Sequence, residues 1–138
     1  MRNYIIIGGS SGIGKELVSI LEGQGANVFS TYNNNIVQDR ANVSYIKFDV
    51  KTDTLNLDDL PEQIHGLAYC PGSINLKPFH RFTDEDFIED FKLQVLGATK
   101  IIKQLLPKIK KSQDASIDLF STIAVQYGFS FHSQVAIS

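Results

Sequence analysis

The stretch that decides the fold is Gly8-Gly9-Ser10-Ser11-Gly12-Ile13-Gly14, which follows an apolar run at Asn3–Ile7 and precedes a segment with helical spacing. Glycines let the backbone turn sharply and approach a ligand, and a helix N-terminus offers unpaired N–H groups with a partial positive charge. A strand, a glycine-rich loop and a helix in this order predict a phosphate-binding site. The alternative is a tight turn without a ligand, which needs fewer glycines than the four present here.

Short apolar runs rich in β-branched residues alternate with longer amphipathic stretches along the rest of the chain. This alternation is typical of a parallel sheet covered by helices on both faces. We expect strands at Asn3–Ile7, Asn27–Thr31, Ser44–Phe48, Gly66–Cys70 and Ser116–Phe120. The predicted fold class is therefore α/β, a doubly wound parallel sheet in three layers.

Helical spacing predicts a first helix from about Gly12 to Glu22. Thr83 is a suitable N-cap for the longest helix, and Pro107 should kink or end that helix. A short helix is expected around Leu57–Gln63, and residues 32–42 read as a loop. Residues 131–138 look like the opening of a further helix, so we expect the chain to be cut off after the fifth strand of a longer fold.

Composition limits the class of protein. Hydrophobic residues make up 43% and charged residues 20% of 138 residues, which indicates one globular domain over residues 1–138. The formal net charge of -2 gives no broad basic face for nucleic acid, and no apolar stretch suits a membrane span. Cys70 is the only cysteine, so we expect a reducing, cytoplasmic setting. His65, His80 and Cys70 lack paired ligand spacing, so no metal site is predicted.

A nucleoside triphosphate site is a second interpretation of the glycine loop. Gly9 and Gly14-Lys15 nearly match the P-loop pattern, which continues with a Ser or Thr that holds Mg²⁺. Position 16 is Glu16, which lacks the required hydroxyl. The dinucleotide interpretation is therefore favoured.

The loop also resembles a known family. Residues 7–14 are similar to the T-G-x-x-x-G-I-G loop of the short-chain dehydrogenase/reductase family, with Ile7 in place of the threonine. Later segments resemble further motifs of that family, in the same order. Phe48-Asp49-Val50 is similar to its Asp-Val motif, whose acid contacts the adenine. Residues 67–72 resemble its L-V-N-N-A-G segment, and residues 94–97 resemble its N-V-x-G segment. The resemblance covers the N-terminal part of the family fold and implies a Rossmann-like NAD(P)-binding domain.

The cofactor contacts expected from the resemblance and from the end of the second strand can be named. They are Gly8, Ser10, Ser11, Gly12, Ile13, Gly14, Asn33, Asn34, Asp49, Val50, Cys70, Pro71 and Gly72. The second strand ends without a carboxylate, whereas NAD-specific sites usually place an acid there. We therefore expect NADP, with NAD as the alternative, and Arg40 as a further donor to the 2′-phosphate.

The resemblance implies catalytic positions that this chain fills only in part. The family's helix asparagine corresponds to Gln94, and its serine to Thr122 or, one residue off register, Ser121. The family's catalytic tyrosine corresponds to Val135, which cannot donate a proton. His132 is the first surrogate acid we consider, because it would share a helix face with position 135.

Each surrogate acid has a plainer interpretation. A histidine at position 132 is more often a surface or capping residue, and a tyrosine before a glycine, as at Tyr127, the second surrogate, is commonly a packing residue. Two functional hypotheses follow. The first is an NAD(P)-dependent oxidoreductase acting on a small carbonyl or alcohol with atypical catalytic residues; the second is a non-catalytic dinucleotide-binding sensor or partner subunit.

The apolar long helix also favours a homo-oligomer, unless that helix is buried within one subunit.

Overall fold

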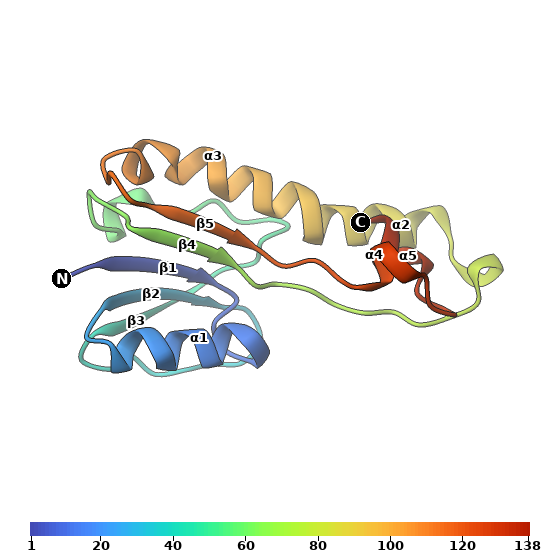
Figure 1. The fold of residues 1–138 in the computed structure, drawn as a ribbon, viewed down its shortest axis with the longest axis horizontal. Helices are drawn as coiled ribbons and strands as arrows, with labels where there is room; N and C mark the ends of the chain where they lie inside the picture. The colour runs from blue at the N-terminus through green and yellow to red at the C-terminus, as the bar shows by residue number, and fades with distance from the viewer.

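The computed structural model describes residues 1–138 and contains one parallel sheet (Figure 1). Its strands are β1 (Asn3–Ile7), β2 (Asn27–Tyr32), β3 (Val43–Lys47), β4 (Gly66–Tyr69) and β5 (Ser116–Leu119). They lie in the order β3-β2-β1-β4-β5, and all neighbouring pairs are parallel. The order reverses at β1, so the carboxyl end of this strand is the switch point where α/β proteins bind ligands. The predicted α/β Rossmann-like fold is confirmed.

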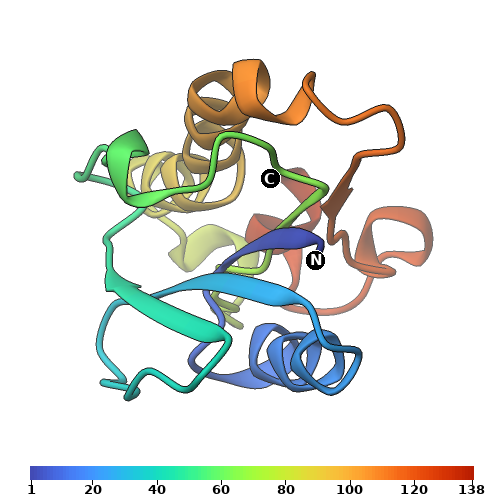
Figure 2. The same cartoon turned by 90° about the vertical axis from the view of Figure 1, so that its left-hand side faces the viewer.

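Alternating side chains of the strands build a core on each face of the sheet. In β1, Ile5 and Ile7 belong to one core, and Ile6 belongs to the other. The larger core lies beneath the long helix and contains Ile101 and Leu105, whereas the smaller core lies beneath the first helix. A central strand buried on both faces needs consecutive apolar residues, which is why the run at Ile5–Ile7 is uninterrupted. Figure 2 shows the resulting three layers end-on.

The helix after the glycine loop, α1 (Gly12–Gly23), lies on one face of the sheet. The other face is covered by α3 (Gly97–Ile109). Together with a π-helical turn (Lys92–Leu96) and α2 (Asp84–Phe91), which lies beyond the sheet, α3 forms one long helical rod. Thr83 begins the rod with a complete capping box, as its sequence predicted. The expected short helix is a single 3-10 turn at Leu57–Asp59.

Pro107, expected to kink or end the long helix, does not end it. The helix continues to Ile109, because Lys108 and Ile109 are both buried on its sheet-facing side. Proline removes one backbone donor, yet in the last turn of a helix that loss is small compared with the burial of an apolar side chain. The sheet therefore fixes where α3 ends.

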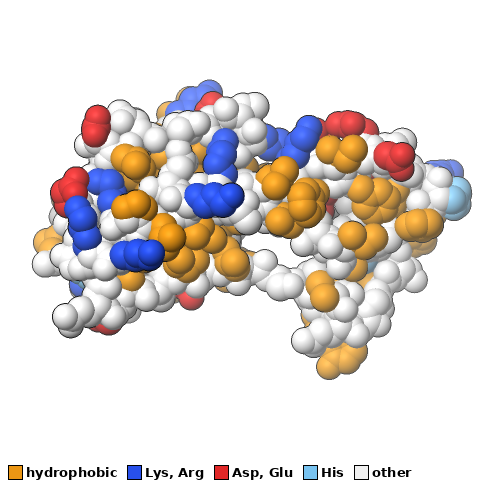
Figure 3. Space-filling model, turned by 90° about the horizontal axis from the view of Figure 1, so that it is seen from above, with side chains coloured by type: hydrophobic (Ala, Val, Ile, Leu, Met, Phe, Trp, Pro, Cys, Tyr) orange, Lys and Arg blue, Asp and Glu red, His pale blue; other side chains and the backbone are white.

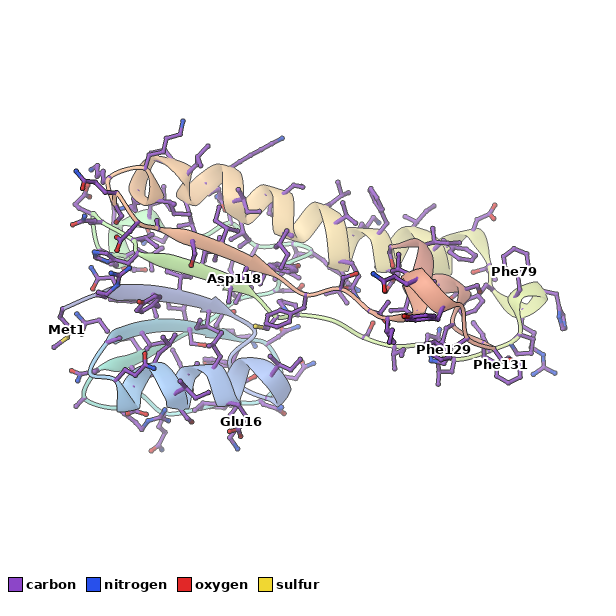
Figure 4. All side chains as sticks on the ribbon, in the orientation of Figure 1. Met1, Glu16, Phe79, Asp118, Phe129 and Phe131 are labelled. Atoms are coloured by element: carbon purple, nitrogen blue, oxygen red, sulfur yellow. The ribbon has the colours of Figure 1, made fainter.

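The last part of the chain extends beyond the sheet. After β5, α4 (Ala124–Tyr127) and α5 (Ser133–Ile137) form a small extension that packs beside α2 (Figure 1). Figure 4 labels Phe79, Phe129 and Phe131 at the tip of this extension, far from Met1. Hydrophobic side chains are visible on the same part of the surface in Figure 3.

The apolar residues of the long helix divide between interior and surface. Ile101, Leu105 and Ile109 are buried against the sheet, as the single-subunit interpretation requires. Ile88, Phe91 and other residues near the start of the rod are exposed instead. None of the helices combines the length and apolar composition needed to cross a membrane.

Candidate functional site

The first pocket lies at the carboxyl ends of β1, β2, β3 and β4, next to the glycine loop. It has a volume of about 550 Å³, within the range usual for small-molecule sites. The pocket brings together most of the residues predicted to contact a cofactor: Gly8, Ser10, Ser11, Gly12, Ile13, Asn33, Asn34, Asp49, Val50, Cys70, Pro71 and Gly72. Residues from four strand ends therefore surround one cavity, although they are distant in the sequence.

Of the glycine-loop residues predicted to contact the cofactor, only Gly14 does not line the pocket. A Cβ at this position would lie 2.1 Å from the Gly8 carbonyl oxygen, so Gly14 allows α1 to pack against the loop. Gly9 has a similar packing role, because a Cβ there would lie 1.9 Å from the Ser30 hydroxyl oxygen. Ser30 is itself fixed, since its hydroxyl donates to the Ile6 carbonyl at 3.1 Å. Gly9 and Gly14 thus allow close packing within the protein.

Gly12 faces open space. It has a φ of +55°, and a Cβ there would meet no atom within 4 Å. The preceding residue, Ser11, is the N-cap of α1 but makes no side-chain capping hydrogen bond, and the first turn holds no acid. The N–H groups at the start of α1 are therefore free to bind an anionic group, and this arrangement fits the pyrophosphate of a dinucleotide.

The loop is held open by Thr31 on the neighbouring strand. The Gly8 N–H donates to the Thr31 side-chain oxygen at 2.9 Å, and the Gly9 N–H donates to the Thr31 carbonyl at 3.0 Å. Thr31 also lines the pocket. The sequence analysis missed this residue, whose only signal was its place at the end of the second predicted strand.

The triphosphatase interpretation gains no support from the geometry. Glu16, at the position of the Mg²⁺ ligand in a P-loop, is exposed on the outer side of α1 and points away from the sheet (Figure 4). The structure also holds no group of three His, Cys, Asp or Glu side chains that could bind a metal.

The basic residue that lines the pocket is Lys51, not the predicted Arg40. Asn33 and Asn34 line the pocket, but Arg40 does not. The Arg40 guanidinium instead makes a bidentate salt bridge to Glu22 of α1, with distances of 2.8 to 3.1 Å. The cation that does line the pocket is Lys51, which sequence reasoning missed because it lies in a loop without a motif.

Asp49 and Cys70 have specific environments in the pocket wall. The Asp49 carboxylate accepts a hydrogen bond from the Lys51 N–H at 2.9 Å, which closes a tight turn after β3. Burial raises the pKa of the Cys70 thiol to about 11, and the negative charge of Asp118 adds to this shift. Cys70 is therefore a neutral thiol at physiological pH, not a reactive nucleophile.

A second pocket of about 440 Å³ adjoins the first, and the two share Cys70, Pro71 and Gly72. The predicted catalytic residues Gln94, Ser121 and Thr122 all line this second pocket. The Thr122 side-chain oxygen accepts from the Ala124 N–H at 3.2 Å, so its hydroxyl proton remains available for a ligand.

Val135 lines the same pocket, at the position that the family resemblance assigns to a tyrosine. His132 does not line it. Its ring packs against Phe129 at 5.5 Å between centroids, and its Nδ1 lies 2.6 Å from the Ser130 carbonyl oxygen. Tyr127 is also outside the pocket and is 72% exposed. The structure therefore brings neither surrogate acid to the reaction space.

Tyr69 is the phenol that does line the second pocket, yet it is engaged elsewhere. Its hydroxyl donates to the Leu93 carbonyl at 2.5 Å, in the π-helical turn, and burial raises its pKa. A Cβ on Gly97 would lie 2.3 Å from this hydroxyl oxygen, which explains the glycine. Tyr69 thus positions the helix that carries Gln94.

The chain has the same fold as several solved structures. A short-chain dehydrogenase from Streptomyces avermitilis aligns with a TM-score of 0.82 at 18% identity over 99% of this chain and 56% of its own. A putative short chain dehydrogenase from Pseudomonas syringae gives 0.85 at 19% identity over 99% of this chain and 63% of its own. Aldohexose dehydrogenase from Thermoplasma acidophilum gives 0.82 at 17% identity, covering 99% and 55%.

This chain thus spans between about half and two thirds of the length of these structures. The comparison with curated proteins finds no match. The family model described as short chain dehydrogenase matches residues 2–134, which is nearly the full chain. The chain therefore belongs to the short-chain dehydrogenase family.

Proposed function

We propose that this chain forms the dinucleotide-binding region, and part of the substrate-binding region, of an NAD(P)-dependent oxidoreductase acting on a small carbonyl or alcohol. The observation that carries the proposal is the shared wall of the two pockets at Cys70–Gly72. A dinucleotide in the first pocket and a substrate in the second would meet at this wall. When bound, the dinucleotide exchanges a hydride with the substrate carbon.

The residues of the second pocket have roles that suit this chemistry. The Thr122 hydroxyl donates a hydrogen bond to the substrate oxygen, and Ser121 lies beside it in the same wall. The amide of Gln94 offers both a donor and an acceptor to the same space. These groups orient a carbonyl, but none of them is an acid.

We infer a preference for NADP from the charges in the first pocket. The end of β2 contributes Asn33 and Asn34 and no carboxylate that would repel a 2′-phosphate. Lys51 also lines the pocket, although its ammonium group lies 3.4 Å from Glu89. Arg40 has no part in this proposal because Glu22 holds it. A lower dissociation constant for NADH than for NADPH would contradict the preference.

Fluorescence titration with NADPH tests the binding site directly. Gly12→Val should abolish binding. The new side chain would meet no protein atom, but it would occupy space in the pocket where we propose that the dinucleotide binds. Gly25→Val is a matched control: Gly25 also has a positive φ and open space around it, but it does not line the pocket. If both variants bind NADPH as the unchanged chain does, the loop is not the dinucleotide site.

A non-catalytic sensor or partner subunit is the second candidate function, and Val135 is the observation that favours it. A chain without an acid at this position would still bind the dinucleotide. NADPH oxidation measured with a panel of small aldehydes and ketones separates the two candidates. Turnover supports the oxidoreductase, and binding without turnover supports the sensor.

We also propose a cytoplasmic homo-oligomer. Ile88, Phe91 and Leu96 on the long helical rod are 46% to 49% exposed and form an apolar surface with Ile137. Burying such side chains against a second copy would be favourable. Light scattering that shows a monomer would contradict this proposal.

A further inference from the structure

Asp90 is a buried carboxyl group that the roles described above do not use. It lies in the last turn of α2 and is only 5% exposed, although the rest of the acids on this helix lie at the surface or are partly exposed. A buried carboxylate normally requires a cation close by. The salt bridges of α2 instead engage Asp86 with Lys77, and Glu89 with Lys51 and Lys92.

Two side chains connect Asp90 to the second pocket. The Ser138 hydroxyl donates to an Asp90 carboxyl oxygen, and Ser138 lines the pocket. Gln94 lies one helical turn after Asp90, where its amide lowers the pKa of the Asp90 carboxyl group, and it also lines the pocket. The Gln94 amide reaches the shared wall, since its Nε2 lies 3.5 Å from where a Cβ on Gly72 would be. Asp90 is thus one hydrogen bond away from the second pocket, through Ser138.

The groups packed around Asp90 carry little charge. Burial raises its pKa, while the Gln94 hydrogen bond and the more distant charge of Lys51 lower it. The helix α5, which packs on α2 (Figure 1), has no titratable side chain of its own. The residue before it, His132, has its ring nitrogen beside the Ser130 carbonyl oxygen. A carboxyl group in such surroundings keeps its proton to a higher pH than an exposed one.

We propose that Asp90 is the proton source of the second pocket and delivers its proton through the hydroxyl of Ser138. This inference rests on the proposed oxidoreductase function. In the reducing direction, the substrate alkoxide takes the hydroxyl proton of Ser138, and the serine oxygen takes the carboxyl proton of Asp90. Asp90 ends as a carboxylate and regains a proton from water. The relay supplies the acid that Val135 lacks.

The first test needs neither cofactor nor turnover. Carbon-13 NMR of the Asp90 carboxyl in the ligand-free protein measures its titration midpoint, and Asp90→Asn identifies the signal by its loss. We expect a midpoint above the ordinary value of about 3.9, and a change in that midpoint in Ser138→Ala, which removes one hydrogen bond. A midpoint at or below about 3.9, or one that Ser138→Ala leaves unchanged, would overturn the relay.

The second test uses the pH dependence of carbonyl reduction. Asp90→Asn should lower kcat by about 10²-fold and leave the NADPH dissociation constant unchanged. In the unchanged chain kcat should decline as the pH rises above the Asp90 titration midpoint, and Asp90→Asn should abolish this decline. Asp90→Glu should restore part of the rate. Asp84→Asn, the same change at an exposed site of the same helix, should have no effect. An unchanged kcat in Asp90→Asn would refute the relay. If the unchanged chain shows no turnover while the NMR coupling to Ser138 is present, the oxidoreductase proposal fails instead.

Discussion

Gly14→Ala tests the packing of the glycine loop against α1. The added Cβ would lie 2.1 Å from the Gly8 carbonyl oxygen, 2.9 Å from the Gly8 carbonyl carbon and 3.0 Å from the Gly9 Cα. All of these are backbone atoms, so no side-chain rotation relieves the clash. The loop must move away from the helix. Overpacking in a tight site costs about 1–3 kcal/mol, and the short distance to oxygen places this variant near about 3 kcal/mol.

Urea unfolding followed by circular dichroism measures this loss as a change in the free energy of unfolding. Gly23→Ala is the matched control, because it makes the same change at the end of the same helix, where a Cβ meets nothing within 4 Å. That variant should be more stable than the unchanged chain by about 0.5 kcal/mol, since alanine restricts the unfolded state. The two substitutions should therefore have opposite signs. If Gly14→Ala unfolds at the same urea concentration as the unchanged chain, the steric reasoning is wrong.

Further predictions concern thiol reactivity, stability and rate. Burial and the charge of Asp118 raise the pKa of Cys70 to about 11, so at pH 8 iodoacetamide should modify it about 100-fold more slowly than a free cysteine, measured by mass spectrometry; an equal rate would contradict the burial. Burial raises the pKa of Asp90 in the folded state, so stability should fall as the pH rises through that pKa. Asp90→Asn should therefore unfold at higher urea than the unchanged chain at pH 8, with the advantage shrinking toward pH 4, and a less stable variant at pH 8 would refute the reasoning. Val135→Tyr, which places a phenol in the second pocket, should raise carbonyl reduction at least about tenfold in an NADPH oxidation assay, and no increase would mean that position 135 is not the acid site.

Local patterns predicted the sheet well because burial on both faces leaves a strong signal. The five strands lie at the predicted positions to within a few residues, and Thr83 begins the long helix as its N-cap chemistry requires. The glycine loop was equally visible, because its backbone geometry admits few other residues. Features that depend on one segment and its neighbours in the chain were therefore predictable.

Contacts between distant segments were not predictable. Arg40 was a reasonable phosphate ligand by sequence position, but Glu22 on α1 lies closer to it in space. Pro107 was expected to kink or end the long helix, yet the helix continues past it, and the sheet beneath α3 keeps Ile109 buried and helical. His132 shares a sequence neighbourhood with Val135 but precedes α5 and turns toward Ser130. For Arg40 and Pro107 a tertiary partner outweighed a local preference, whereas His132 is held by its chain neighbours Phe129 and Ser130.

The π-helical turn at Lys92–Leu96 has a consequence for how this chain tolerates insertions and deletions. A π turn holds one residue more than the α-helical turn it replaces, and each residue of an α-helix advances the rotation by about 100°. Deleting a single residue here would restore a regular helix but turn α2 by that angle relative to α3. Asp90 would leave the interior and Gln94 would leave the pocket, although every side chain of the site was still encoded. The number of residues in this turn is therefore as much a part of the site as their identity.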